Sequence, residues 1–469
     1  MKDAIAPLVH HAANFQTDAL PADIAETTQN LFLDIMGCIL SGSSAQGIQE
    51  LMEMMAFWGG DPQATVFSFP ERASAPTAAF LNSIMGHAND YDDTHDAALN
   101  HGCVTLVPAL LATCQALHPS LERPFSGRIP FRVISGPEFI AALAIGLDVS
   151  NRLGMAFIPY LHVGWLPTTL WGPFACAAAC GRLLDLTTDQ MHHAFGLAYS
   201  QIHANRQGLA DGALSKRIQP GFSASAGLNA AFFAANQLTG ARNIINGRFG
   251  IKALYTSNQI RSENLLKDLG RVFETANVSI KPYPSCRCTH PVIDAALELK
   301  DRENLDWKSI RTGTIYLPPQ SMGQIGKDFQ IRSNPTVDAQ FSAAYTAALA
   351  FIKGRPQLKD FESRQVVSRR EVIDLAARFH CLEFEKEQSG LVPIAMEVFL
   401  ENGEALEIRV SEPKGSRNNP LTSEELQAKF NDCLDNSQKN YGLEARSSIL
   451  QAHASIQNFM DMNEIIQRY

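Results

Sequence analysis

The feature that most constrains the fold is a series of segments that are apolar or small on nearly every face of a helix. Phe139–Val149 and Phe174–Leu184 are the clearest, and helix-like periodicity with glycine and proline stops runs from Pro21 to about Gly240. A helix that is apolar all round belongs inside a core, and small residues allow a short interaxial distance. The first part of the chain is therefore predicted to be an all-α domain.

The chain of 469 residues exceeds the size of a single core, because cores stop growing at about 250–300 residues. Two domains are expected. The pattern changes near residue 275, where strand-like alternation appears in Asn277–Tyr283, Thr312–Leu317, Phe379–Glu385, Ile394–Leu400 and Ala405–Val410. Helices are predicted at Val292–Lys300 and Ala339–Ile352, and again at Ser423–Leu434 and Ala445–Ile456. This mixture without a regular repeat predicts a smaller α+β domain, after which the last helices could rejoin the first.

Composition narrows the class of partner and compartment. The chain has 39 Lys+Arg against 48 Asp+Glu, a net charge of -9, and no run of basic residues, which disfavours nucleic acid. An anionic substrate would need a local cluster of cations. The nine cysteines lie mostly in apolar stretches, as in cytoplasmic proteins. No apolar run reaches about 20 residues, and the first residues lack a signal-peptide pattern, so neither membrane insertion nor secretion is expected.

The densest polar segment runs from His87 to Asp96 and is followed by His101. If a helix continues through it, Asp90 and Thr94 share a face with His87 and can orient a base. Asp92 and Asp93 would then point elsewhere, to solvent or to the start of a neighbouring helix. A plain helix end enriched in acids is the alternative.

Two sharper interpretations of this segment are disfavoured. The spacing of Asp90, Asp92 and Thr94 fits the D-x-D-x-T pattern of phosphoaspartyl hydrolases, but no buried strand precedes it and no doubly wound repeat follows. Clustered His and Asp could bind a divalent metal, yet these come from one short segment, and the pair Cys286 and Cys288 has no second pair to complete a zinc site. No metal site is predicted.

Two further segments supply cations. Lys216 and Arg217 precede an alanine-rich helix in a stretch poor in charge, so each is either paired with a buried carboxylate or available to a substrate. In the second segment, Lys281 precedes a proline-rich turn, and Arg287 and His290 flank the start of a helix that Thr289 could cap. The alternatives are a solvated Lys281 and an ordinary helical His290.

Together, the cationic segments and the acidic, histidine-containing segment predict a cleft for a small polycarboxylate. Proton transfer at a carbon next to a carboxylate needs a positioned base, with cations and hydrogen-bond donors around the carboxylate that gains charge. Both kinds of group are present in the sequence.

At these segments the chain resembles the MmgE/PrpD family. The stretches that carry the resemblance are HANDYDDTH with NHG and VTLVPALLA, SKRIQPGFSASAG, KPYPSCRCTHPVIDAAL, PTVDAQFSAAYTAALAFIKG and KGSRNNPLTSEEL. The resemblance implies a mainly α fold, with a large helical domain from residues 1–271 and 411–469 and an α+β lid domain at 272–410. It also implies a homodimer that works without a cofactor. The family includes 2-methylcitrate dehydratase, cis-aconitate decarboxylase and iminodisuccinate epimerase.

Carried over residue by residue, the family's site falls on Asp90, Thr94, His101, Lys216 and Lys281, with Cys286 where some relatives have His. Leu166 stands where dehydratases and decarboxylases of the family have His, and the dehydratase-type HPSDN is absent. Nearby His162 lies in a different helical phase and does not substitute.

Loss of a proton donor at Leu166 counts against elimination and decarboxylation, so an epimerase of the iminodisuccinate type is the leading expectation. His101 and either Lys281 or Cys286 would exchange the proton, and Asp90 with Thr94 would orient His101. Lys216, Arg287 and His290 would bind carboxylates. A lyase acting on a citrate-like or aconitate-like acid is the alternative, and a helical binding protein without activity is the third hypothesis.

Overall fold

The computed structural model describes residues 3–121, 129, 131–384 and 390–469. The chain forms two compact units. The first comprises residues up to 88, 92–278 and 433–469, and the second comprises 89–91 and 279–432. Residues 89–91 and 411–432 thus group with the second unit, whereas the predicted domain ranges assigned them to the helical domain. Each unit is described here by itself.

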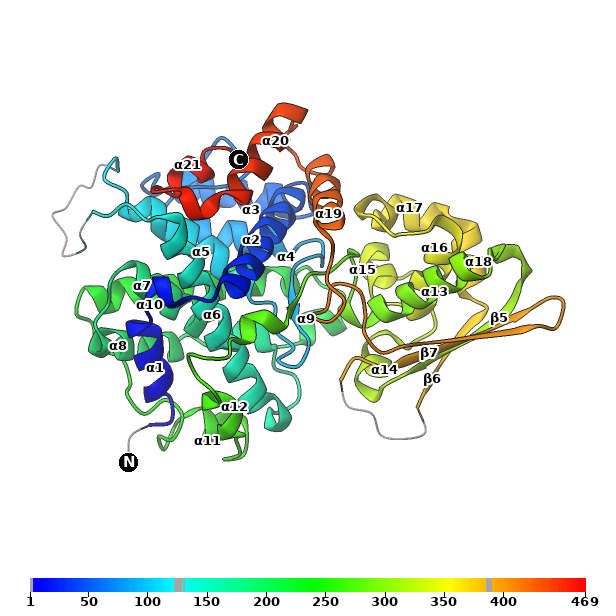
Figure 1. The fold of residues 1–469 in the computed structure, drawn as a ribbon, viewed down its shortest axis with the longest axis horizontal. Helices are drawn as coiled ribbons and strands as arrows, with labels where there is room; N and C mark the ends of the chain where they lie inside the picture. The colour runs from blue at the N-terminus through cyan, green and yellow to red at the C-terminus, as the bar shows by residue number, and fades with distance from the viewer. Residues whose placement is uncertain (1–2, 122–128, 130, 385–389) are drawn as a thin grey trace. The chain divides into compact units, whose positions relative to one another are not determined.

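The first unit is almost entirely helical, as the sequence predicts (Figure 1). Its longer helices are α1 (Ala6–Asn14), α2 (Ala22–Gly42), α3 (Ile48–Trp58), α4 (Ala75–His87), α5 (Cys103–Leu117), α6 (Gly136–Phe157), α7 (Pro167–Leu183), α8 (Thr188–Tyr199), α10 (Ser215–Ala235) and α20 (Leu443–Ala454). Short helices are α9 (Gln207–Ala210), α11 (Ile251–Tyr255), α12 (Ser262–Leu266) and α21 (Asn463–Ile466). Two-residue strands are β1 (Ala64–Thr65), β2 (Arg72–Ala73) and β3 (Thr94–His95).

The centre of this unit is α7, which packs against α6, α10, α5 and α8. Close approach of α7 and α10 depends on Gly227, because a Cβ there would lie 2.4 Å from the Cβ of Cys176. The predicted central position of α6 is also confirmed. Among the described residues, one helical stretch, Gly136–Tyr160, is long and apolar enough to cross a membrane, and its apolar window is 94% buried inside the protein. Burial in the helical core therefore accounts for its composition.

Several helix starts in the first unit are fixed by side chains, as the local sequence dictates. The hydroxyl of Ser135 accepts from the backbone N–H of Glu138 while the Glu138 carboxylate accepts from the Ser135 N–H, and Thr187 and Gln190 form the same box at α8. Each box satisfies N–H groups that have no partner within the helix. These caps set where α6 and α8 begin.

The second unit combines a four-stranded sheet with helices, in agreement with the predicted α+β texture. Its strands are β5 (Ile310–Leu317), β6 (Phe379–Glu383), β7 (Ile394–Leu400) and β8 (Ala405–Val410), in the order β6-β5-β7-β8. Its helices are α13 (His290–Arg302), α14 (Pro319–Ile325), α15 (Pro335–Gln340), α16 (Ala343–Lys353), α17 (Ser363–Ser368), α18 (Arg370–Ala376) and most of α19 (Ser423–Asp435). β5 and β6 are parallel, and the other two pairings are antiparallel.

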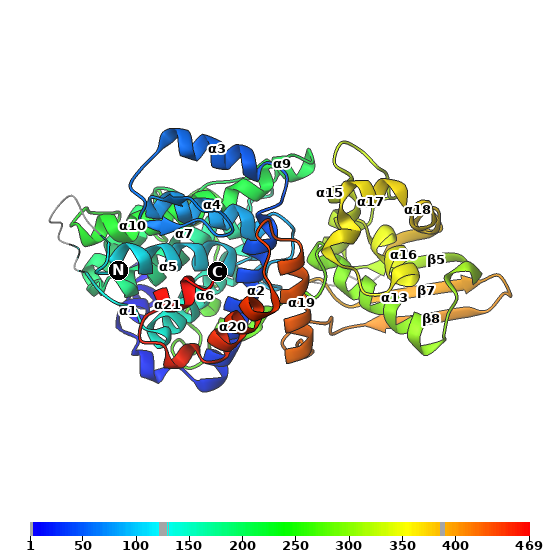
Figure 2. The same ribbon diagram turned by 90° about the horizontal axis from the view of Figure 1, so that it is seen from above.

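Helices α13 and α16 pack on this sheet and on each other, as Figures 1 and 2 show. The apolar side chains of Ile315, Met396 and Ile408 lie at paired positions on successive strands and belong to the buried core of the unit. A predicted strand at Asn277–Tyr283 is shorter than expected, because β4 covers Val278–Ser279 alone. Proline has no N–H to donate to a ladder, so Pro282 stops the strand from continuing. Of the predicted strand Phe379–Glu385, residue 385 lies outside the described residues.

Candidate active site

The polar segment after α4 is a turn with a short strand, so the prediction of a continued helix was wrong. Helix α4 ends at His87, and β3 follows at Thr94–His95. Asp90 has φ +53° and Leu99 has φ +48°, in the left-handed region that no helix can pass through. Aspartate tolerates this conformation better than most residues. The expected common face of His87, Asp90 and Thr94 therefore does not form.

Asp93 caps the helix that follows. Its carboxylate accepts hydrogen bonds from the N–H groups of Gly102 at 3.2 Å and Cys103 at 3.1 Å, at the start of α5. The predicted alternative, in which an acid of this segment caps a neighbouring helix, is confirmed for Asp93. Burial, with the nearby charge of Asp92, raises the pKa of Asp93 to about 7. The carboxyl group fixes the backbone next to His101.

Asp92 lies between two histidines. Its Oδ2 atom is 2.8 Å from Nδ1 of His87 and 3.2 Å from Nδ1 of His101. The Asp92 side chain is fully buried, whereas 21% of the His101 side chain is exposed. The two imidazole rings meet edge to face with centroids 5.1 Å apart. A single carboxylate thus fixes the orientation of both rings, and His101 is the ring that solvent or a substrate can reach.

The protonation states in this cluster follow from burial and contact. Burial, helped by Lys216, lowers the pKa of His87 to about 4 against the opposing effect of Asp92, so His87 is neutral at pH 7. Burial acts to raise the pKa of Asp92, but His87 and His101 outweigh it and hold the pKa well below its usual value. An ionised carboxylate can only accept, so Nδ1–H of each ring donates to Asp92. When the ring is neutral, Nε2 then carries the lone pair.

His101 has further partners on neighbouring elements. Its backbone N–H donates to Oγ1 of Thr168, in the first turn of α7, at 2.9 Å. Oγ1 of Thr94 lies 3.4 Å from Nδ1 of His101. The predicted contact between Thr94 and His101 is therefore present, while Asp92 takes the orienting role that the helical phase assigned to Asp90.

Lys216 brings a cation to the same unit. It lies in the first turn of α10, which begins at Ser215, and its charge contributes to the low pKa of His87. The first N–H groups of a helix have no acceptor within the helix, and the helix dipole is positive at that end. A lysine there adds to a potential that already favours an anion. The start of α10 is thus suited to a substrate carboxylate, as predicted for Lys216.

Lys281 is buried, so the alternative of a solvated lysine was wrong. In the second unit, its Nζ donates to the backbone carbonyl of Asp90 at 2.9 Å and lies 3.3 Å from Oδ1 of the same residue. The exposed fractions of the two side chains are 1% and 7%. Asp90 is itself held by its neighbour, because the Tyr91 hydroxyl donates to the carbonyl of Pro282. The pair forms the second predicted cluster.

Cys286 lies close to this pair in the second unit. A hydrogen bond from Cys288 and the charge of Lys281 lower its pKa, although burial and Asp90 act in the opposite direction. A lowered pKa increases the thiolate fraction, which is the reactive form of cysteine. The thiol predicted to exchange protons is therefore in an environment that favours its ionised form.

Arg287 and His290 are both engaged within the second unit. Nη1 of Arg287 donates to the carbonyl of Lys414 at 2.9 Å and to Nδ1 of His290 at 3.3 Å. Nε2 of His290 then donates to the carbonyl of Ser285 at 3.2 Å. Burial and the charge of Arg287 hold the pKa of His290 well below its usual value. Their predicted contact with a substrate stays a prediction, and the contacts described here brace the turn before α13.

The predicted N-cap of α13 does not form. Thr289 precedes the helix, but its hydroxyl donates to the carbonyl of Cys286 at 2.8 Å and makes no capping bond to the helix. Its backbone is already helical, with φ -81° and ψ -16°, whereas a capping threonine is usually extended. A 3₁₀ turn at Arg287–Thr289 leads into α13 and removes the expected free start.

The position that departs from the family pattern is also defined. Leu166 is the residue before α7 and offers no proton donor. His162 is exposed, and its Nε2 lies 3.0 Å from Oγ of Ser257. This placement agrees with the prediction that His162 does not replace the family histidine.

The same cluster is the group of metal-ligating side chains found in the described part of the chain. His87, Asp92 and His101 each offer one atom, and these atoms lie within 4.8 Å of one another. The prediction of no metal rested on all ligands coming from one short segment. The turn between α4 and α5 brings these three together in spite of that.

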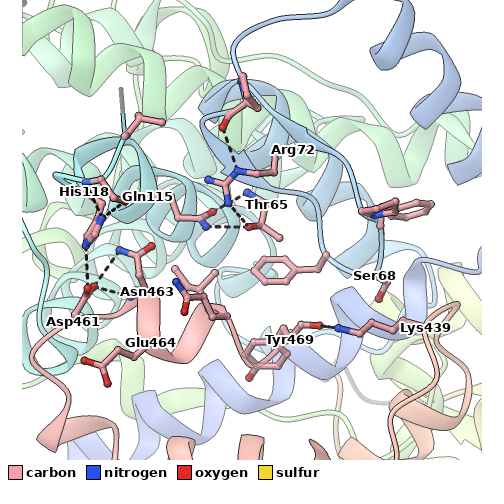
Figure 3. Close-up of a pocket in the computed structure, with 18 residues that line it drawn as sticks. Thr65, Ser68, Arg72, Gln115, His118, Lys439, Asp461, Asn463, Glu464 and Tyr469 are labelled. Atoms are coloured by element: carbon pink, nitrogen blue, oxygen red, sulfur yellow. Dashed lines mark hydrogen bonds and ion pairs between the residues drawn. The ribbon is translucent and has the colours of Figure 1, made fainter. Parts of the chain in front are cut away.

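A separate cavity of about 810 Å³ lies in the first unit (Figure 3). Arg72 donates to two backbone carbonyls, Lys439 donates to the carbonyl of Tyr469, and His118 lies 3.0 Å from Asp461. None of the described residues that line it is a predicted site residue. Because its cations already have acceptors, this cavity is a weaker candidate for a polycarboxylate than the cluster at Asp92.

Sequence reasoning missed Asp92 and underrated His87. Both belong to the motif that was singled out, but a helical phase places Asp92 on the wrong side. The signal that could have found them is the density of Asp and His over so few residues, which a regular helix cannot satisfy in one direction.

Curated relatives cover most of the chain. "Cis-aconitate decarboxylase-like protein oryM" of Aspergillus oryzae is 27% identical over 440 residues, covering 91% of this chain and 89% of the relative. "Cis-aconitate decarboxylase" of Aspergillus terreus is 26% identical, covering 91% and 88%. The protein of that name from Homo sapiens is 23% identical, covering 87% and 82%.

Two family models match the chain in consecutive segments. The model of the MmgE/PrpD N-terminal domain matches residues 6–263, and that of the MmgE/PrpD C-terminal domain matches residues 283–452. Together they span both units. The resemblance noted in the sequence motifs is thereby confirmed, and the chain belongs to the MmgE/PrpD family.

Proposed function

We propose that the chain is a lyase that decarboxylates or dehydrates a small polycarboxylate of the aconitate or citrate type. The observation that carries the proposal is the Asp92 carboxylate, which holds two neutral-capable imidazoles by their Nδ1 atoms and leaves the partly exposed His101 with Nε2 for proton transfer. The relatives with printed activities are cis-aconitate decarboxylases, which supports a lyase over an epimerase.

The chemistry requires one well-placed proton. In decarboxylation the bond to the departing carboxylate breaks, the electron pair stays on carbon, and an acid protonates that carbon as CO2 leaves. In dehydration a base removes the proton next to a carboxylate, and hydroxide leaves with a proton. An oriented imidazole serves as either acid or base near neutral pH. His101 is assigned this role.

Binding of the carboxylates is assigned to cations. Lys216 at the start of α10 is the candidate in the first unit. Lys281 and Cys286 are kept in the proposal because the backbone links their partner Asp90 to Asp92 through one residue, and two peptide links span at most about 7 Å. A carboxylate that gains charge during the reaction is stabilised by such cations more than its ground state.

The test is a substrate panel followed by NMR. The purified protein is incubated with cis-aconitate, citrate and related acids in the presence of a chelator, and loss of CO2 or water is followed in time. The proposal expects turnover of at least one of these acids. Complete stability of every acid in the panel, with a protein that is folded by circular dichroism, contradicts it.

An epimerase is the second candidate, and Leu166 is the observation in its favour. With no proton donor at that position, a reaction that only removes and returns one proton has an advantage. Incubation with iminodisuccinate in D2O separates the two. An epimerase incorporates solvent deuterium at the α-carbon without loss of CO2 or water, whereas the proposed lyase does not turn over this acid.

A further inference from the structure

The cluster of His87, Asp92 and His101 has the geometry of a metal site as well as that of a proton-transfer site. The distances from Asp92 Oδ2 to Nδ1 of His87 and of His101 are 2.8 and 3.2 Å, and the three ligand atoms lie within 4.8 Å of one another. With metal–ligand bonds of about 2.0–2.2 Å, neighbouring ligand atoms are roughly 3–3.5 Å apart. Two of the three separations are already near this range.

A second observation points to a cation. Oδ1 of Asp92 is buried and has no hydrogen-bond partner among the described residues. A buried, ionised carboxylate with an unsatisfied oxygen is costly, and a bound cation relieves that cost. The other oxygen is the atom that both imidazoles contact, so one ion at this point would meet all three ligands.

We propose that this cluster is an inhibitory site for a divalent transition ion, with Zn²⁺ the best match. Two imidazoles and one carboxylate suit Zn²⁺, Cu²⁺ or Ni²⁺, whereas Mg²⁺ and Ca²⁺ prefer all-oxygen shells. The partly exposed side of His101 gives access, and water completes the shell. Lys216 acts electrostatically on His87 and opposes a cation, which limits the affinity.

Metal binding at Nδ1 has a defined consequence for proton transfer. Each neutral ring carries its proton on Nδ1 when it donates to Asp92, so the ion displaces that proton, which is then held on Nε2. No net proton needs to be released. His101 then has no lone pair left at Nε2, and it cannot act as a base. Inhibition, unlike binding, therefore rests on the function proposed above.

The test begins with binding to the full-length protein, freed of metal by a chelator and then dialysed. Calorimetric titration with Zn²⁺ should show one site, and Co²⁺ should give the visible absorption of a nitrogen- and oxygen-bound ion. Mg²⁺ should not compete. His101→Gln should weaken Zn²⁺ binding by about 100-fold or more, since loss of a direct ligand costs at least as much as loss of its support.

Matched variants keep the result decisive. His118→Gln removes a histidine that also lies 3.0 Å from an aspartate, and it should leave Zn²⁺ affinity unchanged. His87→Gln is the second ligand variant, used if His101→Gln does not fold by circular dichroism. No one-site binding of Zn²⁺, or equal binding by the wild type and a folded ligand variant, overturns the proposal.

Activity separates the two proposals. One-site binding with inhibition that a chelator reverses supports both. One-site binding lost in His101→Gln but without inhibition keeps the metal site and contradicts the role of His101 in catalysis. Substrate turnover without any zinc binding contradicts the metal site alone.

Discussion

Asp92 Oδ2 lies 3.2 Å from His101 Nδ1, and this contact joins a fully buried carboxylate to an imidazole that is partly exposed. The same oxygen also holds His87. Because the carboxylate can only accept, it determines which nitrogen of His101 carries the proton. The contact is therefore the structural basis of the proposed proton transfer.

Replacing Asp92 by Asn should lower kcat by about 100-fold or more with a small change in KM, because the amide can donate to the ring and favour the wrong tautomer. Steady-state rates on the accepted acid measure this. The exposed Asp61 provides the control, since Asp61→Asn should behave as wild type. An unchanged kcat in a folded Asp92→Asn protein would remove the orienting role.

Replacing Lys216 by Met should raise KM for a polycarboxylate several-fold to about 100-fold, because it removes a cation at the start of α10. The wild-type KM should also rise with salt more steeply than that of the variant. Lys267→Met, which changes an exposed lysine of the same unit, is the control. Equal KM values for both variants would show that Lys216 does not bind substrate.

The prediction from sequence succeeded where a local pattern decides the structure. Strands β7 and β8 have the predicted bounds, because alternation of apolar residues marks a sheet with one buried face. The central helices α6 and α7 were found for the same kind of reason. The cations Lys216 and Lys281 stood out because charge is rare in their surroundings.

The prediction failed where the backbone leaves regular structure. A left-handed Asp90 ends the helical phase, and only the folded turn shows that Asp92 faces His87 and His101. Thr289 was expected to cap α13, but a 3₁₀ turn uses its hydroxyl instead. These outcomes depend on tertiary contacts, which no short window of sequence contains.

Lys281 and Asp90 should behave as a coupled buried pair. Lys281→Met alone should lower the free energy of unfolding by about 3–5 kcal/mol, because it leaves the Asp90 carboxylate buried without its partner. The double variant with Asp90→Asn should recover much of that loss. Denaturant unfolding of the two single variants and the double variant gives the coupling. Additive losses would show that the two side chains do not stabilise each other.

The stability should fall with acid in a way that His453 explains in part. Burial lowers its pKa from 6.5 to about 3 in the folded protein. The unfolded chain therefore binds a proton at a higher pH than the folded one, so the contribution is complete above pH 6.5 and is lost as the pH falls toward 3. His453→Gln should lose less stability than wild type between pH 7 and pH 4 in thermal melts. Parallel curves for the two proteins would contradict this assignment.

The most direct test of the proposed function is the rate of proton transfer in His101→Gln on the acid that the wild type turns over. The proposal predicts a fall in kcat of about 10²–10⁴-fold, with wild-type circular dichroism and thermal stability, while His162→Gln keeps the wild-type rate. A folded His101→Gln protein that turns over the same acid at the wild-type rate would contradict it.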